Sequence, residues 1–189
     1  MEQLLLVTQR LKIRNLRLSD VNDFVQYRSN EEVVKYQGFD VMSKPLAADF
    51  ILSQQDKQIG DIGEWVQFGI ECGIRQKLIG DCAIKFADDS HAEIGITISH
   101  LEQQNGFGSE AMNGILGYLF DVVGLHRIVE ITDVKNLASI SMLESVGFRR
   151  EGHFVENVFF KGSWGSEYQY AFLKSEWDLK KKLKNDVCS

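Results

Sequence analysis

The chain has 189 residues, 44% of them hydrophobic and 25% charged, which predicts one soluble globular domain with a core of its own. The net charge of −6 argues against nucleic acid as a partner. The sequence shows no signal peptide, and no apolar run approaches the roughly 20 residues of a membrane span, so we expect no membrane partner. Three cysteines, Cys72, Cys82 and Cys188, lack C-x-x-C spacing, so we expect no metal site and a reduced, cytoplasmic protein.

The first half of the chain predicts one strand, two helices and three further strands. Residues 11–17 alternate apolar and polar side chains, as in a half-buried strand. Helices are predicted from Ser19-Asp20 to about Ser29 and after Ser43, where Pro45 suits a first turn. Short segments rich in Val, Ile and Phe, separated by turn residues, then predict three antiparallel strands at 64–72, 77–87 and 92–99.

The second half predicts helices at 106–123 and 138–145, and strands at 127–132, 149–161 and 167–173. Gly147 suits the residue after the second helix. The order β-α-α-β-β-β-α-β-α-β-β predicts a mixed α/β (α+β) fold with a mostly antiparallel seven-stranded sheet. We expect a single domain over 1–189, with its core at about 9–177 and a solvated tail at 178–189.

Residues 103–111 match two patterns for a phosphate-binding loop at the start of a helix. Gly106-Phe107-Gly108-Ser109-Glu110-Ala111 fits the dinucleotide motif G-x-G-x-x-A, with Glu130 in place of its ribose-binding acid. The antiparallel strands before the loop, and the short chain after Glu130, disfavour that fold. Helix amides next to glycines still suit an anion, although the glycines could serve only a tight turn.

Four blocks in register resemble the GNAT superfamily of acetyl-CoA-dependent N-acetyltransferases, and within it the RimJ/RimL-type branch. The blocks are Glu93-Ile94-Gly95-Ile96-Thr97-Ile98; Gln103-x-x-Gly106-x-Gly108-x-Glu110-Ala111; Asn136, Ser139, Glu144, Gly147 and Phe148; and Gly162, Trp164, Glu167, Glu176 and Trp177. The resemblance covers nearly the whole chain. It implies the GNAT fold, with the strands at 92–99 and 127–132 splayed apart, and acetyl-CoA as the acetyl donor without a metal.

The resemblance also implies how the coenzyme is held. The loop from Gln104 to Ser109 would bind the pyrophosphate, and backbone near Ile98 and Ser99 would polarise the thioester carbonyl. Asn136 would contact the pantetheine arm in the splayed region. The implied coenzyme contacts are Ile98, Ser99, Gln103, Gln104, Asn105, Gly106, Phe107, Gly108, Ser109, Asn136 and Ser139.

Two residues are the candidate catalytic groups. Glu93 lies where related enzymes carry a glutamate base, and its alternative role is structural, at the sheet surface; Glu64 and Asp81 remain other candidates. Many members use a tyrosine as the acid at the position of Leu143, so Ser139 is the candidate here, with helix capping as its alternative role.

We therefore expect a monomeric or homodimeric N-acetyltransferase that moves an acetyl group directly from acetyl-CoA to a primary amine in a ternary complex. The acceptor is a small molecule or a protein N-terminus, and the sequence does not choose between them. The missing tyrosine favours one alternative, a non-catalytic acyl-CoA sensor with the same fold.

Overall fold

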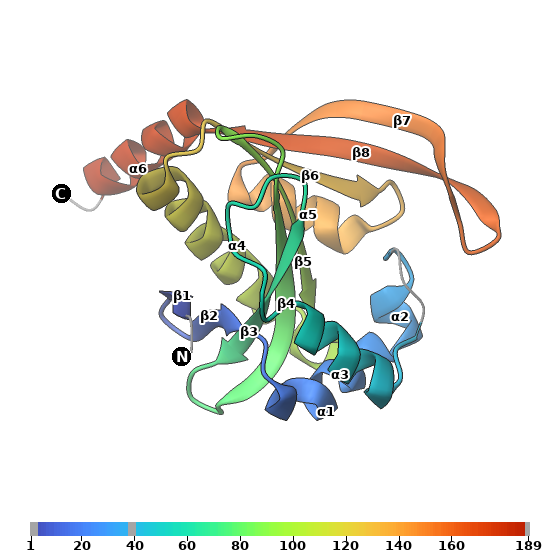
Figure 1. Cartoon of the computed structure of the whole chain (residues 1–189). Helices are drawn as coiled ribbons and strands as arrows, with labels where there is room; N and C mark the ends of the chain where they lie inside the picture. Colours follow the sequence, from blue (N-terminus) through green and yellow to red (C-terminus); the bar gives the residue numbers. More distant parts are fainter. Residues whose placement is uncertain (1–3, 38–40, 188–189) are drawn as a thin grey trace.

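The computed structural model describes residues 4–37 and 41–187, and in these residues it contains an eight-stranded sheet with the order β1-β2-β3-β4-β5-β6-β8-β7 (Figure 1). All neighbouring strands are antiparallel except β5 and β6. The strands are β1 (Leu4–Val7), β2 (Leu11–Asn15), β3 (Trp65–Cys72), β4 (Lys77–Phe86), β5 (His91–Ile98), β6 (Arg127–Asp133), β7 (Arg149–Phe160) and β8 (Ser163–Leu173).

Helices connect these strands and cover both faces of the sheet. They are α1 (Val21–Arg28), α2 (Glu31–Val34), α3 (Lys44–Ser53), α4 (Phe107–Gly117), α5 (Leu137–Val146) and α6 (Lys174–Val187), with 3-10 turns η1 (Leu18–Asp20) and η2 (His100–Glu102) and a π-helical segment η3 (Tyr118–Val123). The predicted mixed, mostly antiparallel fold is confirmed. The sheet has eight strands where the sequence predicts seven, because the uniformly apolar β1 shows no alternation.

The region predicted as a solvated C-terminal tail differs most from expectation, because α6 continues through it to Val187. Trp177 is buried against the core. The Lys180 ammonium donates to Asn113 Oδ1 (2.8 Å) and to the Val146 carbonyl (2.6 Å), while that of Lys181 pairs with Asp121 (2.7 Å). Lysine stems lie along apolar surface while their ammonium groups find acceptors, so a lysine-rich stretch forms a packed helix.

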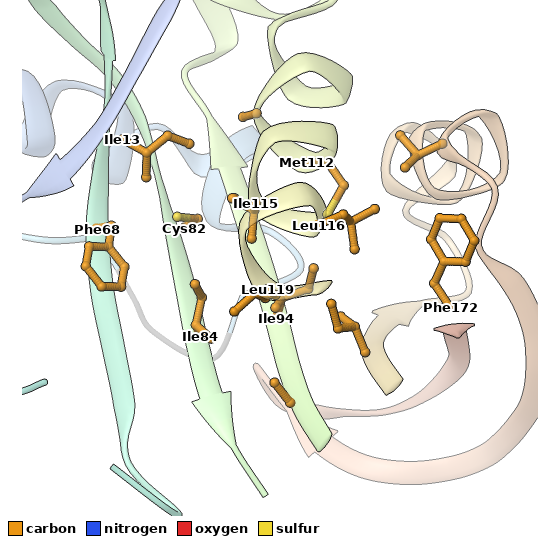
Figure 2. Packing of buried hydrophobic residues seen from close by; sticks show 14 of the residues in the cluster. Ile13, Phe68, Cys82, Ile84, Ile94, Met112, Ile115, Leu116, Leu119 and Phe172 are labelled. Carbon is orange, nitrogen blue, oxygen red and sulfur yellow. The ribbon is translucent and has the colours of Figure 1, made fainter. Parts of the chain in front are cut away.

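The larger core lies between the sheet and α4. Figure 2 shows Ile13, Phe68, Cys82, Ile84 and Ile94 of the strands facing Met112, Ile115, Leu116 and Leu119 of α4 and η3. Alternate strand residues point to this face, as the period of two requires. A second, smaller core packs α1 and α3 on the opposite face around Phe24, Tyr27 and Ile51.

The sheet is divided between β5 and β6, as predicted. These parallel strands pair only at His91–Arg127, Ala92–Ile128 and Glu93–Val129. Beyond these pairs, β5 runs to Ile98 and β6 to Asp133 without facing residue pairs between them. The facing edges therefore carry backbone groups that are available to a bound ligand.

The hairpin of β7 and β8 extends toward α2 from the half of the sheet that β6, β8 and β7 form (Figure 1). Its two-residue turn, Lys161-Gly162, has positive φ at both positions (47° and 82°), which suits a tight hairpin. At this turn the Lys161 ammonium donates to the Val34 carbonyl at the end of α2 (2.8 Å).

No helix in the described part of the chain is both long and apolar enough to cross a membrane.

Candidate active site

The glycine-rich loop takes a shape that its sequence explains. Gln104 (φ 62°) and Gly106 (φ 76°) both adopt left-handed backbone, and only glycine does so readily. Asn105 Nδ2 donates to the carbonyls of Glu102 (3.3 Å) and Gln103 (3.2 Å), which fixes the turn. Residues 103–106 are exposed, so the loop is accessible to a ligand.

The N-terminus of α4 presents unpaired amides directly after this loop. The Glu110 amide makes the first helical bond, to the Gly106 carbonyl (3.0 Å), so the amides of Phe107, Gly108 and Ser109 precede it. No side chain caps this end of α4. Such amides and the positive end of the helix dipole attract an anion.

Gly108 has a packing role as well. A Cβ atom built on Gly108 would lie 3.1 Å from Met142 Sδ of α5 and 3.7 Å from Ile98 Cγ1. The absent side chain therefore lets α4 approach α5. Gly106 therefore shapes the turn, as one interpretation of the glycines predicts, and Gly108 allows close packing of α4 on α5.

Arg10, from the turn between β1 and β2, is a candidate residue that the sequence analysis missed. Its Nη1 donates to the Asn105 carbonyl (3.1 Å), and its Nε donates to Glu110 Oε2 (2.6 Å). Burial alone raises the pKa of Glu110, but hydrogen bonds from Thr8 and Arg10 outweigh it and hold that pKa below its usual value. Arg10 is about one hundred positions from the loop, so no local motif could reveal it.

The unpaired edge of β5 offers amides for a thioester carbonyl. The Ser99 amide is occupied, because it donates to the Ile79 carbonyl of β4 (2.8 Å). Adjacent residues of a strand direct their backbone groups to opposite edges, and the Ile98 carbonyl indeed accepts from Gln103 Nε2 (3.1 Å) on the other side. The amides of Ile98 and Ile96 therefore face the unpaired region, and Ser99 does not supply the donor.

Asn136 and Ser139 lie at the start of α5. Asn136 caps this helix, since its Oδ1 accepts from the Ser139 amide (3.2 Å). The Ser139 side chain is thus free of the capping role and donates from Oγ to Glu130 Oε1 of β6 (3.3 Å). Leu143, the position at which the resemblance implies a tyrosine acid, is a buried core residue.

Glu130 is the second candidate residue that sequence reasoning missed, because the sequence offered it only as a dinucleotide ligand. It is 5% exposed, and its Oε2 is buried without a hydrogen-bond partner. Burial, together with the nearby charge of Glu93, raises the pKa of Glu130 to about 8 although Ser139 lowers it. The signal available in the sequence was an acid within a buried strand.

The three predicted base candidates have different surroundings. Glu93 is half-buried on β5, and its carboxylate pairs with Lys85 (2.7 Å), whose ammonium lies over the Trp65 ring (4.6 Å). Asp81 is 1% exposed and accepts four hydrogen bonds, from Tyr27, Gln67 and twice from Arg28. Glu64 is exposed and pairs with Lys57 (3.0 Å). Only Glu93 combines access to solvent with a place beside the divided strands.

Within residues 4–37 and 41–187, no group of three or more His, Cys, Asp and Glu side chains could hold a metal ion. His100, beside the loop, is exposed.

A divided sheet beside an uncapped helix N-terminus, with a serine on the adjoining helix, suits an extended ligand that carries a phosphate group. The profile of the Acetyltransferase (GNAT) domain matches residues 10–149, and the chain belongs to this family. It is therefore an N-acetyltransferase that uses acetyl-CoA as its acetyl donor.

Relatives and solved structures agree with this assignment. The chain is 32% identical over 174 residues to the uncharacterized N-acetyltransferase YnaD of Bacillus subtilis, and the alignment covers 92% of this chain and 99% of that protein. It is 26% identical over 174 residues to a spermidine N(1)-acetyltransferase of Vibrio cholerae, and the alignment covers 90% of this chain and 97% of that protein. The structure of a GNAT-family acetyltransferase from Bacillus anthracis superposes on this chain with a TM-score of 0.82 and 26% sequence identity. The superposition covers 93% of this chain and 100% of that chain.

Proposed function

We propose that the protein, as an enzyme of the RimJ/RimL type, acetylates a primary amine by direct transfer within a ternary complex. The observation that carries this proposal is the unpaired edge of β5, which begins directly after Glu93 and leads to the exposed loop at Gln103. One continuous edge thus joins a candidate base to an anion-binding helix end.

The loop holds the donor's pyrophosphate in this proposal. The amides of Phe107, Gly108 and Ser109 donate to the phosphate oxygens, and Arg10 keeps the loop in place through Asn105 and Glu110. Bound acetyl-CoA supplies the thioester carbonyl that the amine attacks. The Ile98 and Ile96 amides donate to that carbonyl, and their fixed positions favour the charge that develops on it.

Two side chains move the protons. Glu93 accepts a proton from the incoming amine, directly or through water, once its pairing with Lys85 rearranges. Ser139 donates to the departing thiolate, which is supported by its release from the capping role that Asn136 performs. Fixing both reactants beside β5 lowers the barrier further, because attack becomes intramolecular.

The acceptor is a primary amine, small or at a protein N-terminus. The similarity to a spermidine N(1)-acetyltransferase makes spermidine the first small amine to test. The similar proteins do not identify a particular protein as the acceptor, so peptides with free N-termini are included in the same test.

The test measures thiol release from acetyl-CoA with a panel of amines and N-terminal peptides. We expect steady release with at least one acceptor. Binding of acetyl-CoA without release for any acceptor would support a non-catalytic sensor instead.

A matched pair of glycine variants tests the loop. Gly106→Val and Gly60→Val both force a branched residue into left-handed backbone (φ 76° and 104°), and Gly60 lies between α3 and β3, away from the loop. We expect Gly106→Val alone to weaken coenzyme A binding in calorimetry, by about tenfold or more for the loss of an aligned anion site. Equal binding by both variants would contradict the assignment of the loop.

A further inference from the structure

Glu130 is a buried acid that the proposed mechanism does not use. It lies in β6 just beyond the last residue paired with β5, so its strand is unpaired on that side. Oε1 accepts from Ser139 Oγ (3.3 Å), and Oε2 is enclosed without any partner. A carboxylate can accept about four hydrogen bonds, so this site leaves a negative charge poorly satisfied.

The groups around Glu130 favour its neutral form. On β5, Glu93 adds a like charge, and on β8 the facing residue is Tyr170, whose hydroxyl donates to Glu144 of α5 (2.8 Å) instead. Arg150 of β7 lies across from Tyr170, and its guanidinium stacks over Tyr168 (4.5 Å). Ser139 supplies the one hydrogen bond that Glu130 receives, so no cation balances its charge among these neighbours.

We infer that Glu130 and Ser139 form a proton relay in which Glu130 is the acid behind the serine that protonates the departing thiol. This inference rests on the proposed function. It makes Glu130 a positioning residue and proton source that acts through Ser139 and does not itself touch the sulfur.

The relay balances as follows. When Glu130 is protonated, its O–H donates to Ser139 Oγ and leaves the serine proton directed at the sulfur. As the carbon–sulfur bond breaks, its electron pair goes to sulfur, the serine proton follows, and the Glu130 proton moves to the serine oxygen. Glu130 is left as a carboxylate, the amine proton is on Glu93, and solvent restores both groups.

An acid behind the serine is chemically needed. A serine that gave up its proton alone would become a half-buried alkoxide without a counter-charge. A thiol of the cysteine type has a pKa of about 8.5, close to the value of about 8 for Glu130, so proton transfer between them is nearly isoenergetic.

The activity test compares Glu130→Gln with Glu144→Gln in thiol release across pH. Glu144 is a matched control, because it is an acid on α5 that accepts a hydrogen bond but does not contact Ser139. An acceptor amine whose own pKa lies well below about 8, such as an aromatic amine, keeps its ionisation out of the pH profile. At saturating substrates, kcat of the parent enzyme should fall as pH rises above about 8, where Glu130 loses its proton.

We expect Glu130→Gln to lower kcat by about 10²-fold, the lower range for a positioned proton donor, and to lose the fall above pH 8. Glu144→Gln should keep both. A Glu130→Gln enzyme with the parent rate and profile, or a Glu144→Gln enzyme with the same defect, would overturn the relay.

A stability test does not depend on turnover. The folded pKa of Glu130 is raised from about 4.5 to about 8, so the folded state binds more protons between these values. The free energy of unfolding should therefore fall as pH rises through this window, and Glu130→Gln should remove that fall. Parallel curves for the two proteins overturn the relay alone, whereas an active-site loop that binds acetyl-CoA without any thiol release overturns the proposed function.

Discussion

Two buried acids of the sheet, Asp81 and Glu130, have opposite surroundings. Asp81, on the face covered by α1, accepts four hydrogen bonds, two of them from the buried guanidinium of Arg28. Glu130, on the face covered by α5, accepts one and keeps an oxygen without a partner. Burial alone therefore says little about a role, whereas the number of donors separates a structural acid from a reactive one.

The largest change in stability is expected from a substitution of Asp81. Asp81→Ala leaves Arg28 charged and buried, together with the Tyr27 hydroxyl, so we expect a loss of about 3–5 kcal/mol in the free energy of unfolding. Urea unfolding measures it. Glu64→Ala is the control, because Glu64 is exposed in its pair with Lys57, and its effect should stay within about 0.5 kcal/mol. Similar losses in the two variants would mean that Asp81 is not a structural acid.

The Glu130 side is disturbed next by Asn136→Ala. Loss of this cap should cost about 1 kcal/mol of stability and, by displacing Ser139, lower kcat by about 10-fold to 100-fold. Asn30→Ala removes the equivalent cap of α2, where Asn30 Oδ1 accepts from the Glu32 amide (3.0 Å). At saturating acceptor it should cost similar stability without the loss of kcat. If both variants lose kcat equally, the position of Ser139 does not matter to the reaction.

The smallest expected effect on stability, with the opposite sign to Asp81→Ala, comes from Glu130→Leu. Replacing an unsatisfied buried acid by an apolar side chain of similar size should be neutral or stabilising by about 1 kcal/mol at pH 8. Urea unfolding at that pH checks it, and thiol release should fall as in Glu130→Gln. A loss as large as that of Asp81→Ala would show that Glu130 stabilises the fold.

Much of the fold could be predicted from the sequence, for physical reasons. Turn residues and the change from a period of two to a period near 3.6 placed β3 to β6, α4 and α5 within a few residues. The helix α6 was missed because Lys180 and its neighbours look solvated until Asn113 and the Val146 carbonyl supply acceptors. Those acceptors come from other parts of the chain, so no local pattern contains them.

The candidate site was predicted in its local parts only. The loop around Gly106 and the pair of Asn136 and Ser139 are contiguous motifs, and their positions follow from the blocks that carry them. Arg10 reaches the loop only through the pairing of distant segments. Glu130 and Asp81 look alike in sequence, as acids on strands, and only the count of their partners in three dimensions distinguishes them.

The contact between Lys161 and Val34 ties the hairpin of β7 and β8 to α2. The half of the sheet that carries this hairpin is also joined to the other half by three residue pairs of β5 and β6 and by the larger core. A partly exposed hydrogen bond contributes about 1 kcal/mol, so at room temperature it is open in on the order of one molecule in six. The tip of the hairpin can therefore separate from α2 without any change in the larger core, which packs residues from both halves of the sheet against α4.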